Sequence, residues 1–136
     1  MRKIKRAAAL VGVAATVAVP LATSGTANAS TASVAAANPC GSGYTLRGTL
    51  PVGESSEAQI RFYRSDGSHA CAATFKLGKA VGNNVKIGVW IDARPGGADS
   101  DVGRYREYAG PVKVTGTCVN WGGGYGEYNN SNQPCR

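Results

Sequence analysis

Four cysteines constrain the fold of this 136-residue chain more than any other feature of its sequence. They are Cys40, Cys71, Cys118 and Cys135. An even number of cysteines in a small exported domain is typical of a disulfide framework. Three pairings are open. The sequence favours Cys40 with Cys71 and Cys118 with Cys135, because each pair joins neighbours along the chain and closes a hairpin-sized loop.

The N-terminus predicts that the chain is exported. Four basic side chains precede an apolar run over residues 7–19, and small residues then lead to Ala27-Asn28-Ala29, an A-x-A cleavage pattern. The run is shorter than the roughly 20 apolar residues that a membrane-spanning helix needs. We predict a secretory signal peptide over residues 1–29, a flexible leader over 30–39 and a single all-β domain over 40–136. The mature chain is expected to have no membrane span.

Removal of the signal peptide changes the charge of the chain. The whole sequence has 15 basic and 8 acidic side chains, a net charge of +7. Four of the basic residues lie in the predicted signal peptide, so the mature chain keeps 11 against 8, a net charge of +3. A surplus this small mainly favours solubility. We therefore predict neither nucleic acid nor an anionic membrane as a specific partner.

Alternating apolar and polar residues predict short strands throughout the mature domain. The clearest run is 85–92, in which Ile87, Val89 and Ile91 share one face and Trp90 lies on the other. Asp66-Gly67 is a hairpin signal. Further strands are predicted over 44–52, 56–64, 70–76, 104–109 and 111–120, with a turn region over 78–84 and a long loop over 94–103. These elements indicate an all-β fold, an antiparallel β-sandwich or small barrel stapled by two disulfides.

Motifs near both ends of the mature chain resemble the actinomycete spore-associated proteins, a family of small secreted proteins. The matching segments are 38–44 (NPCGSGY), 108–112 (YAGPV) and 118–123 (CVNWGG), together with Cys71 at the start of a strand and a final cysteine. The resemblance covers nearly the whole chain and is weak between residues 52 and 101. It implies an exported protein at the spore or cell surface, without an established enzymatic activity and without catalytic residues to carry over.

Four aromatic residues are candidates for ligand binding, namely Trp90, Trp121, Tyr125 and Tyr128. The last three surround a run of glycines, with asparagines close by. Aromatic side chains beside polar groups suit flat, amphipathic ligands such as sugar rings. The alternative is that these side chains form part of a core or cover a disulfide. Stacking of single-stranded nucleic acid with Arg104 and Arg106 is the weaker binding hypothesis.

His69 is the candidate for catalysis. It is the one histidine of the chain, and imidazole titrates near neutral pH. A small ribonuclease-like hydrolase could use His69 with Glu54 or Glu57 as its carboxylate and Arg61 as a further group. The alternative is a histidine that is solvated at the hairpin or packs on the neighbouring disulfide.

Other chemistry is less well supported by the sequence. There is no Gly-x-Ser-x-Gly nucleophile motif, and Ser42 lies beside a half-cystine. Asp99 and Asp101 lie in a glycine-rich segment without the spacing of an EF-hand. No C-x-x-C motif supports zinc. We predict no metal and no cofactor.

The sequence thus predicts a secreted structural or binding protein at the spore or cell surface, with spore or cell-wall components as partners and without catalytic activity. A contact with envelope glycans through the aromatic residues is the finer hypothesis. The alternatives are the hydrolase described above and a protease inhibitor that presents residues 94–103. The sequence leaves the oligomeric state open.

Overall fold

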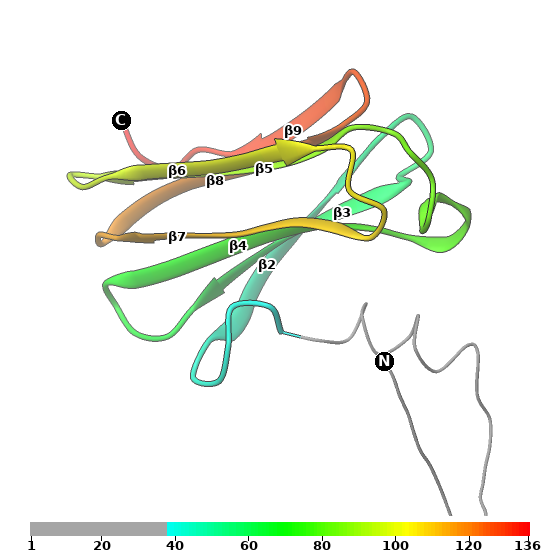
Figure 1. Ribbon diagram of the computed structural model, residues 1–136. Helices are drawn as coiled ribbons and strands as arrows, with labels where there is room; N and C mark the ends of the chain where they lie inside the picture. The colour runs from blue at the N-terminus through cyan, green and yellow to red at the C-terminus, as the bar shows by residue number, and fades with distance from the viewer. Residues whose placement is uncertain (1–37) are drawn as a thin grey trace, which may run out of the picture. The chain divides into compact units, whose positions relative to one another are not determined.

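Short strands joined by turns make up nearly all of residues 38–136, the part of the chain that the computed structural model describes (Figure 1). The predicted signal peptide and residues 30–37 of the predicted leader lie outside the described residues. Within residues 38–136 the strands are β2 (Thr45–Val52), β3 (Ala58–Arg64), β4 (His69–Lys76), β5 (Ile87–Arg94), β6 (Ala98–Gly103), β7 (Tyr108–Thr115), β8 (Cys118–Tyr125) and β9 (Tyr128–Asn132), with one 3-10 turn, η2 (Gly78–Ala80).

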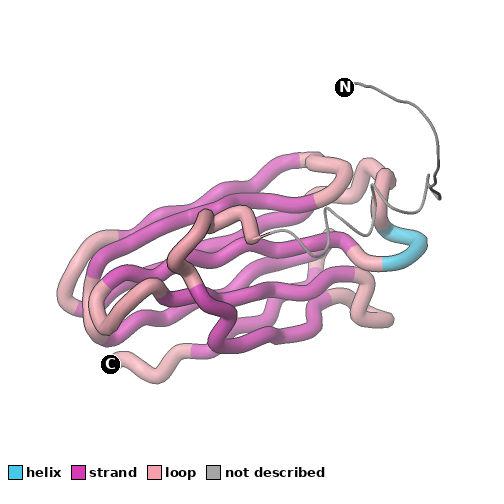
Figure 2. The backbone as a smooth tube through the Cα atoms, turned by 90° about the horizontal axis from the view of Figure 1, so that it is seen from below, coloured by secondary structure: helices cyan, strands magenta, loops and turns pink. Residues whose placement is uncertain are grey.

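The strands form two four-stranded sheets that lie face to face (Figures 1 and 2). Sheet 1 has the order β2-β3-β4-β7, and sheet 2 has the order β6-β5-β8-β9. All paired strands are antiparallel. The prediction of an all-β, antiparallel fold is confirmed, and of the two architectures the sandwich is the one observed.

The core lies between the two sheets and follows the alternation read from the sequence. Ile87, Val89 and Ile91 of β5 are each 1% exposed, and Trp90 on the other face is half-buried. Ile60 and Phe62 of β3 face them from sheet 1. Alternate residues of a strand point to opposite faces, so the period of two in the sequence becomes one apolar face per strand. The predicted faces of β5 are therefore confirmed.

The strand predictions were partly wrong after residue 93. Six of the ten residues of the predicted loop over 94–103 form the strand β6, whereas residues 104–107 precede β7 and lie in no strand. The glycine run after Trp121 belongs to β8 and not to a loop, and β9 was missed. Polar or glycine-rich segments lack the local signal of a strand. β8 forms because β5 and β9 pair with it on both sides, which is a tertiary contribution.

Side chains close the sandwich where the edge strands of the two sheets meet. On one side, the Asp101 carboxylate accepts a hydrogen bond from the Gly110 N–H at 2.8 Å, and Asp99 accepts one from the Lys113 N–H at 3.2 Å. On the other side, the Asn130 side-chain amide donates to the Pro51 carbonyl at 2.8 Å. Unpaired edge strands invite pairing with other chains. Here polar side chains satisfy part of each edge.

Both disulfides join the cysteines in the favoured pairing. Cys40 is bonded to Cys71, which fixes residues 38–44 against the outer face of sheet 1. Cys118 is bonded to Cys135, which ties the C-terminus to the start of β8. The Cys135 N–H also donates to the Asn120 side chain at 2.9 Å. The two bridges therefore fix the chain at both ends of the described domain.

Candidate binding groove

The fold separates the four aromatic candidates. Trp121 is 4% exposed and stacks on Phe62, with ring centroids 5.1 Å apart. Tyr125 is 8% exposed, and its hydroxyl accepts a hydrogen bond from the Asn83 side chain at 2.7 Å. Both are part of the core, which is the alternative that the sequence left open. Trp90 and Tyr128 are the two that remain accessible.

Trp90 and Tyr128 do not share a face. Trp90 points away from the core on the outer face of sheet 2, opposite Gly122 of β8. Tyr128 is 47% exposed and pairs with Tyr125, whose side chain points inward. Directly paired residues of an antiparallel ladder lie on the same face. Only Trp90 therefore contributes to the outer face of sheet 2.

Glycines occupy the centre of that outer face. Gly88 of β5 pairs with Gly124 of β8, and Gly122 is the partner of Trp90. Glycine has no side chain, so at these positions the backbone of β5 and β8 forms the floor of a depression in the surface. Strand interiors usually avoid glycine, and glycine there often marks a close approach by another group. The result is a hollow along β5.

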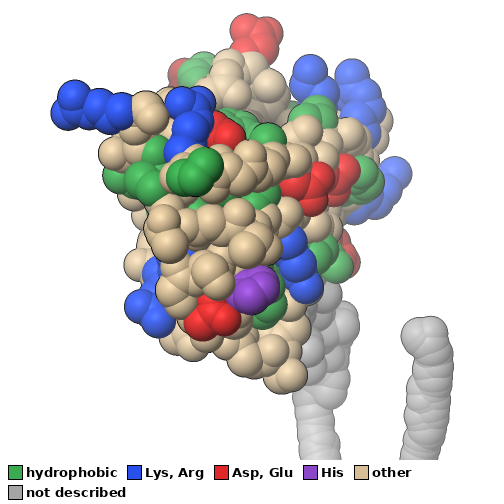
Figure 3. All heavy atoms as spheres, turned by 90° about the vertical axis from the view of Figure 1, so that its left-hand side faces the viewer, with side chains coloured by type: hydrophobic (Ala, Val, Ile, Leu, Met, Phe, Trp, Pro, Cys, Tyr) green, Lys and Arg blue, Asp and Glu red, His purple; other side chains and the backbone are tan. Residues whose placement is uncertain are grey.

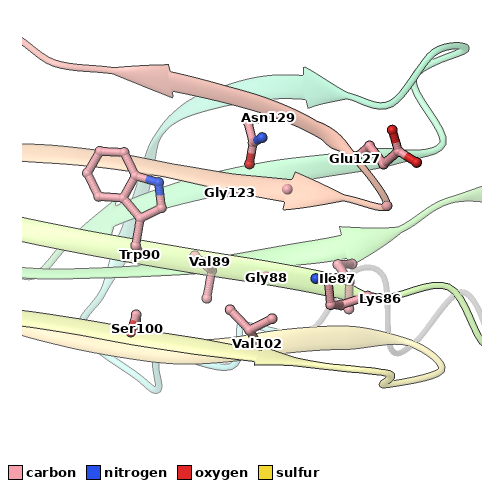
Figure 4. Close-up of a pocket in the computed structure, with 12 residues that line it drawn as sticks. Lys86, Ile87, Gly88, Val89, Trp90, Ser100, Val102, Gly123, Glu127 and Asn129 are labelled. Atoms are coloured by element: carbon pink, nitrogen blue, oxygen red, sulfur yellow. The ribbon is translucent and has the colours of Figure 1, made fainter.

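Side chains from the neighbouring strands form the walls of this hollow, which we call the glycine groove and define by Gly88, Gly124, Trp90, Val102 and Asn129 (Figure 4). Its volume is about 350 Å³. A Cβ at Gly122 would lie 2.8 Å from Cε2 of Trp90. The indole thus rests directly over a glycine. The groove combines one aromatic ring, one apolar side chain and one amide over a backbone floor.

Two further hollows extend the groove along β5. One shares Lys86, Gly126 and Glu127 with the glycine groove and is also lined by Arg104. The other shares Trp90 and Ser100 and continues to Asp92. Figure 4 shows Lys86 and Glu127 at the end opposite Trp90. Asp92 is paired with Arg94 at 2.9 Å, and Asp99, which also lines that hollow, accepts hydrogen bonds from backbone N–H groups.

Cationic side chains hold the loop beside the Lys86 end. The carbonyls of Gly82, Asn83 and Asn84 accept hydrogen bonds from Arg106, Lys76 and Arg104, at 2.8, 2.9 and 3.1 Å. The Lys76 ammonium also donates to the Tyr105 carbonyl at 2.5 Å. Burial lowers the pKa of Lys76 from its usual value, and the charge of Arg106 lowers that pKa further.

His69 has a carboxylate partner, but it is not the predicted one. His69 Nδ1 lies 3.0 Å from the Asp66 carboxylate in the β3–β4 hairpin. The N–H groups of Ser68 and His69 and the imidazole itself hold the pKa of Asp66 well below its usual range. Glu57 precedes β3 at the opposite end of the β3–β4 ladder, about 20 Å away at the usual rise per residue. The structure does not bring His69 together with Glu54 or Glu57.

Arg61, the further group of the catalytic hypothesis, lies over the ring of Phe75 at 4.5 Å and hydrogen-bonds Gln59. These contacts place it on the outer face of sheet 1. His69 is the first residue of β4. Neither His69 nor Arg61 lines the glycine groove. The residues of the catalytic hypothesis are thus dispersed.

The remaining candidates have structural surroundings. Among residues 38–136, no group of three or more histidine, cysteine or acidic side chains could hold a metal ion. The carboxylates of Asp99 and Asp101 accept the backbone hydrogen bonds that close the sandwich. The predicted inhibitory loop over 94–103 shortens to a turn before β6. Ser42 is exposed in the segment that Cys40 anchors.

Charge on the surface is mixed. Figure 3 shows basic and acidic side chains interspersed over the end of the domain that it faces. No helix among the described residues has the length and apolar character to cross a membrane.

The sequence hypothesis did not include Gly88 or Val102. It placed Gly124 and Asn129 beside Trp121, Tyr125 and Tyr128, and of its four aromatic candidates only Trp90 lines the groove. The sequence did contain a signal for the glycine positions, because glycines at alternate positions of a strand leave one face of that strand without side chains. It could be used only once residues 118–125 were recognised as a strand that pairs with β5.

Comparison with known proteins gives one relative. The chain is 35% identical over 121 residues to spore-associated protein A of Streptomyces coelicolor. The aligned region covers 85% of this chain and 77% of that protein. No protein-family model matches the chain. No solved structure matches it either.

Proposed function

Because the chain belongs to the family of the spore-associated proteins, we propose that it acts at the spore or cell surface as a carbohydrate-binding protein, with the glycine groove as its site. The relative supports the location. The predicted signal peptide and the two disulfides are consistent with an extracellular protein.

The observation that carries the proposal is the indole of Trp90 over the glycine floor. Sugar rings have an apolar face that packs against aromatic rings and a rim of hydroxyls that needs hydrogen-bond partners. In the groove, the Trp90 indole and Val102 can contact the apolar face of a sugar. Asn129 and Ser100 can form hydrogen bonds with its hydroxyls. Val102 and Trp90 lie over Gly88 and Gly122, so a ring in the groove would pack on these two side chains.

A binding function fits the groove better than catalysis. Glu127 is the one acidic side chain that lines the glycine groove, and Lys86 is the one basic side chain. General acid–base chemistry needs positioned groups whose pKa values suit proton transfer, in reach of the substrate. His69 lies on the other sheet, outside the groove.

The test is binding of the purified protein to cell-wall and spore polysaccharide. Trp90→Ala should weaken binding roughly tenfold, a loss of about 1.4 kcal/mol. Tyr128→Ala is the matched control, because Tyr128 is an exposed aromatic residue outside the groove. Equal affinities of the wild type and the Trp90 variant would disprove the site. Protein found free in the medium and absent from spore washes would disprove the location.

The hydrogen bond between His69 and Asp66 supports a second candidate, a hydrolase in which a carboxylate orients an imidazole. RNA and ester substrates would test it. Activity that survives in both His69→Ala and Asp66→Asn would exclude this pair as its source.

A further inference from the structure

We infer that the ligand of the glycine groove is an anionic polysaccharide, whose charged groups lie at the Lys86 end while a sugar ring covers Trp90. This inference rests on the proposed function and adds to it the chemical class of the ligand. Three features support it: the continuity of the hollows, the basic side chains at the Lys86 end and the groups that hold the adjacent loop.

The groove is long enough for an extended ligand. Lys86 directly precedes β5 and is four residues before Trp90, about 13 Å at the rise of an extended chain. The hollow beyond Lys86 is open to Arg104 and has a volume of about 500 Å³. A polymer that stacks on Trp90 and follows β5 therefore passes over both cationic side chains.

The segments around that end carry an excess of positive charge. Residues 76–86, 104–107 and 126–127 contain five basic side chains, Lys76, Lys79, Lys86, Arg104 and Arg106. Two acidic side chains, Glu107 and Glu127, accompany them. Of these side chains, Lys86, Arg104 and Glu127 line the hollow at that end, two basic against one acidic. Lys76 is 2% exposed. Charge of one sign at the end of a cleft raises the local concentration of oppositely charged ligands.

The cations at this end are not neutralised by carboxylates. Arg104, Arg106 and Lys76 donate to backbone carbonyls, which leaves their formal charges uncompensated. Lys86 is exposed, and its side chain takes part in no hydrogen bond or ion pair among residues 38–136, whereas its carbonyl accepts a hydrogen bond from the Gly126 N–H at 2.8 Å. Its ammonium is available to a ligand. The planar guanidinium of Arg104 keeps further N–H donors suited to carboxylate or phosphate oxygens.

The experiment compares three probes with the purified protein by titration calorimetry. A polygalacturonate oligomer is the anionic glycan, a cello-oligosaccharide of matched length is the neutral glycan, and inorganic polyphosphate is a polyanion without sugar rings. We expect the polygalacturonate to bind at least about fivefold more tightly than the neutral glycan at 0.05 M salt, and the preference to shrink at about 0.5 M salt because exposed charges are screened.

Substitutions test which side chains cause the preference for polygalacturonate. Lys86→Gln combined with Arg104→Gln should remove most of the preference for polygalacturonate over the neutral glycan. Arg47→Gln, which removes one exposed charge from β2, is the control. Trp90→Ala should weaken both glycans. Lys86→Gln alone, at a side chain without internal partners, keeps the test valid if the double variant does not fold.

The outcomes separate the two proposals. Equal, salt-insensitive binding of both glycans would overturn the anionic preference and leave the carbohydrate site standing. Binding of polyphosphate as tightly as polygalacturonate, unaffected by Trp90→Ala, would overturn the polysaccharide in favour of a simple polyanion. Binding of no probe at all would overturn both proposals. A preference that persists in the Lys86→Gln variants would overturn the assignment to this end of the groove.

Discussion

The outer faces of the two sheets are built from the same kind of antiparallel ladder, yet one is covered and the other is open. On sheet 1, Cys71, Ala73 and Phe75 point away from the core and are at most 1% exposed. Residues 38–44, held by Cys40, cover Cys71, and Arg61 and Tyr108 cover Phe75.

On sheet 2, three of the outward positions of β5 and β8 are glycines, Gly88, Gly122 and Gly124. Gly88 and Gly124 lie side by side without side chains, and Trp90 and Val102 lean over the floor from its edges. The outer face of sheet 1 is therefore covered by side chains and by the segment that the Cys40–Cys71 disulfide holds. The outer face of sheet 2 has a groove where glycines replace larger side chains. Changes to sheet 1 should therefore alter stability, and changes to the groove should mainly alter binding.

The largest effect is expected from loss of the cover of sheet 1. In the chain-entropy model, removing the Cys40–Cys71 bridge by Cys40→Ala costs about 3.5 kcal/mol, since 31 residues separate the pair. Removing the Cys118–Cys135 bridge, with a separation of 17, costs about 3 kcal/mol. Denaturant unfolding measures both. Glycan binding below the unfolding transition should stay unchanged for Cys40→Ala, and a large loss of binding would show that the two faces are coupled.

Filling the floor of sheet 2 comes next. A Cβ at Gly122 would lie 2.7 Å from the Asn130 carbonyl and 2.8 Å from Trp90, so Gly122→Ala must displace β9 or the indole. We expect a loss of about 1–3 kcal/mol of stability together with weaker glycan binding. Gly67→Ala is the control, because nothing lies within 4 Å of a Cβ there. A Gly122→Ala variant with normal stability and binding would contradict the account of the floor.

A matched pair of substitutions compares the two faces directly. Arg61→Ala removes the guanidinium 4.5 Å from the Phe75 ring and should cost about 0.5–1 kcal/mol of stability, with no effect on binding. Trp90→Ala should weaken binding, and because the indole is half-buried over Gly122 it should also cost some stability. Thermal unfolding gives the stability of each variant, and titration with the glycan gives its affinity. The same pattern for both would remove the distinction between a covered and an open face.

The smallest effect concerns the hairpin of sheet 1. Hydrogen bonds from Ser68 and His69 lower the pKa of Asp66 in the folded protein. A carboxylate with a depressed folded pKa contributes stability above its unfolded pKa of about 3.9, and that contribution is lost as the pH falls through the folded pKa. The wild type should therefore lose stability below about pH 4, and Asp66→Asn should lose less over the same range. Identical pH profiles would show that these hydrogen bonds do not stabilise the folded form.

Much of the fold was readable from local signals. The alternation in residues 85–92 identified the core face of β5, Asp66-Gly67 identified the hairpin, and the spacing of the cysteines favoured the observed pairs. β6, β9 and the glycine-rich part of β8 were missed because edge strands and glycine-rich strands carry little apolar periodicity. The site was predicted in part: Trp90 lines the groove, whereas Trp121 and Tyr125 are core residues.

The sequence by itself determined the class of the fold, the framework of disulfides and the family, since these depend on periodicity, cysteine number and motif. The tertiary structure decided which aromatic side chains are accessible and where a groove forms. Periodicity assigns a residue to a face of its own strand, but which face is covered depends on strands far away in the sequence. Phe62 meets Trp121 across the core, and Gly88 meets Gly124 across the ladder, only after the chain has folded.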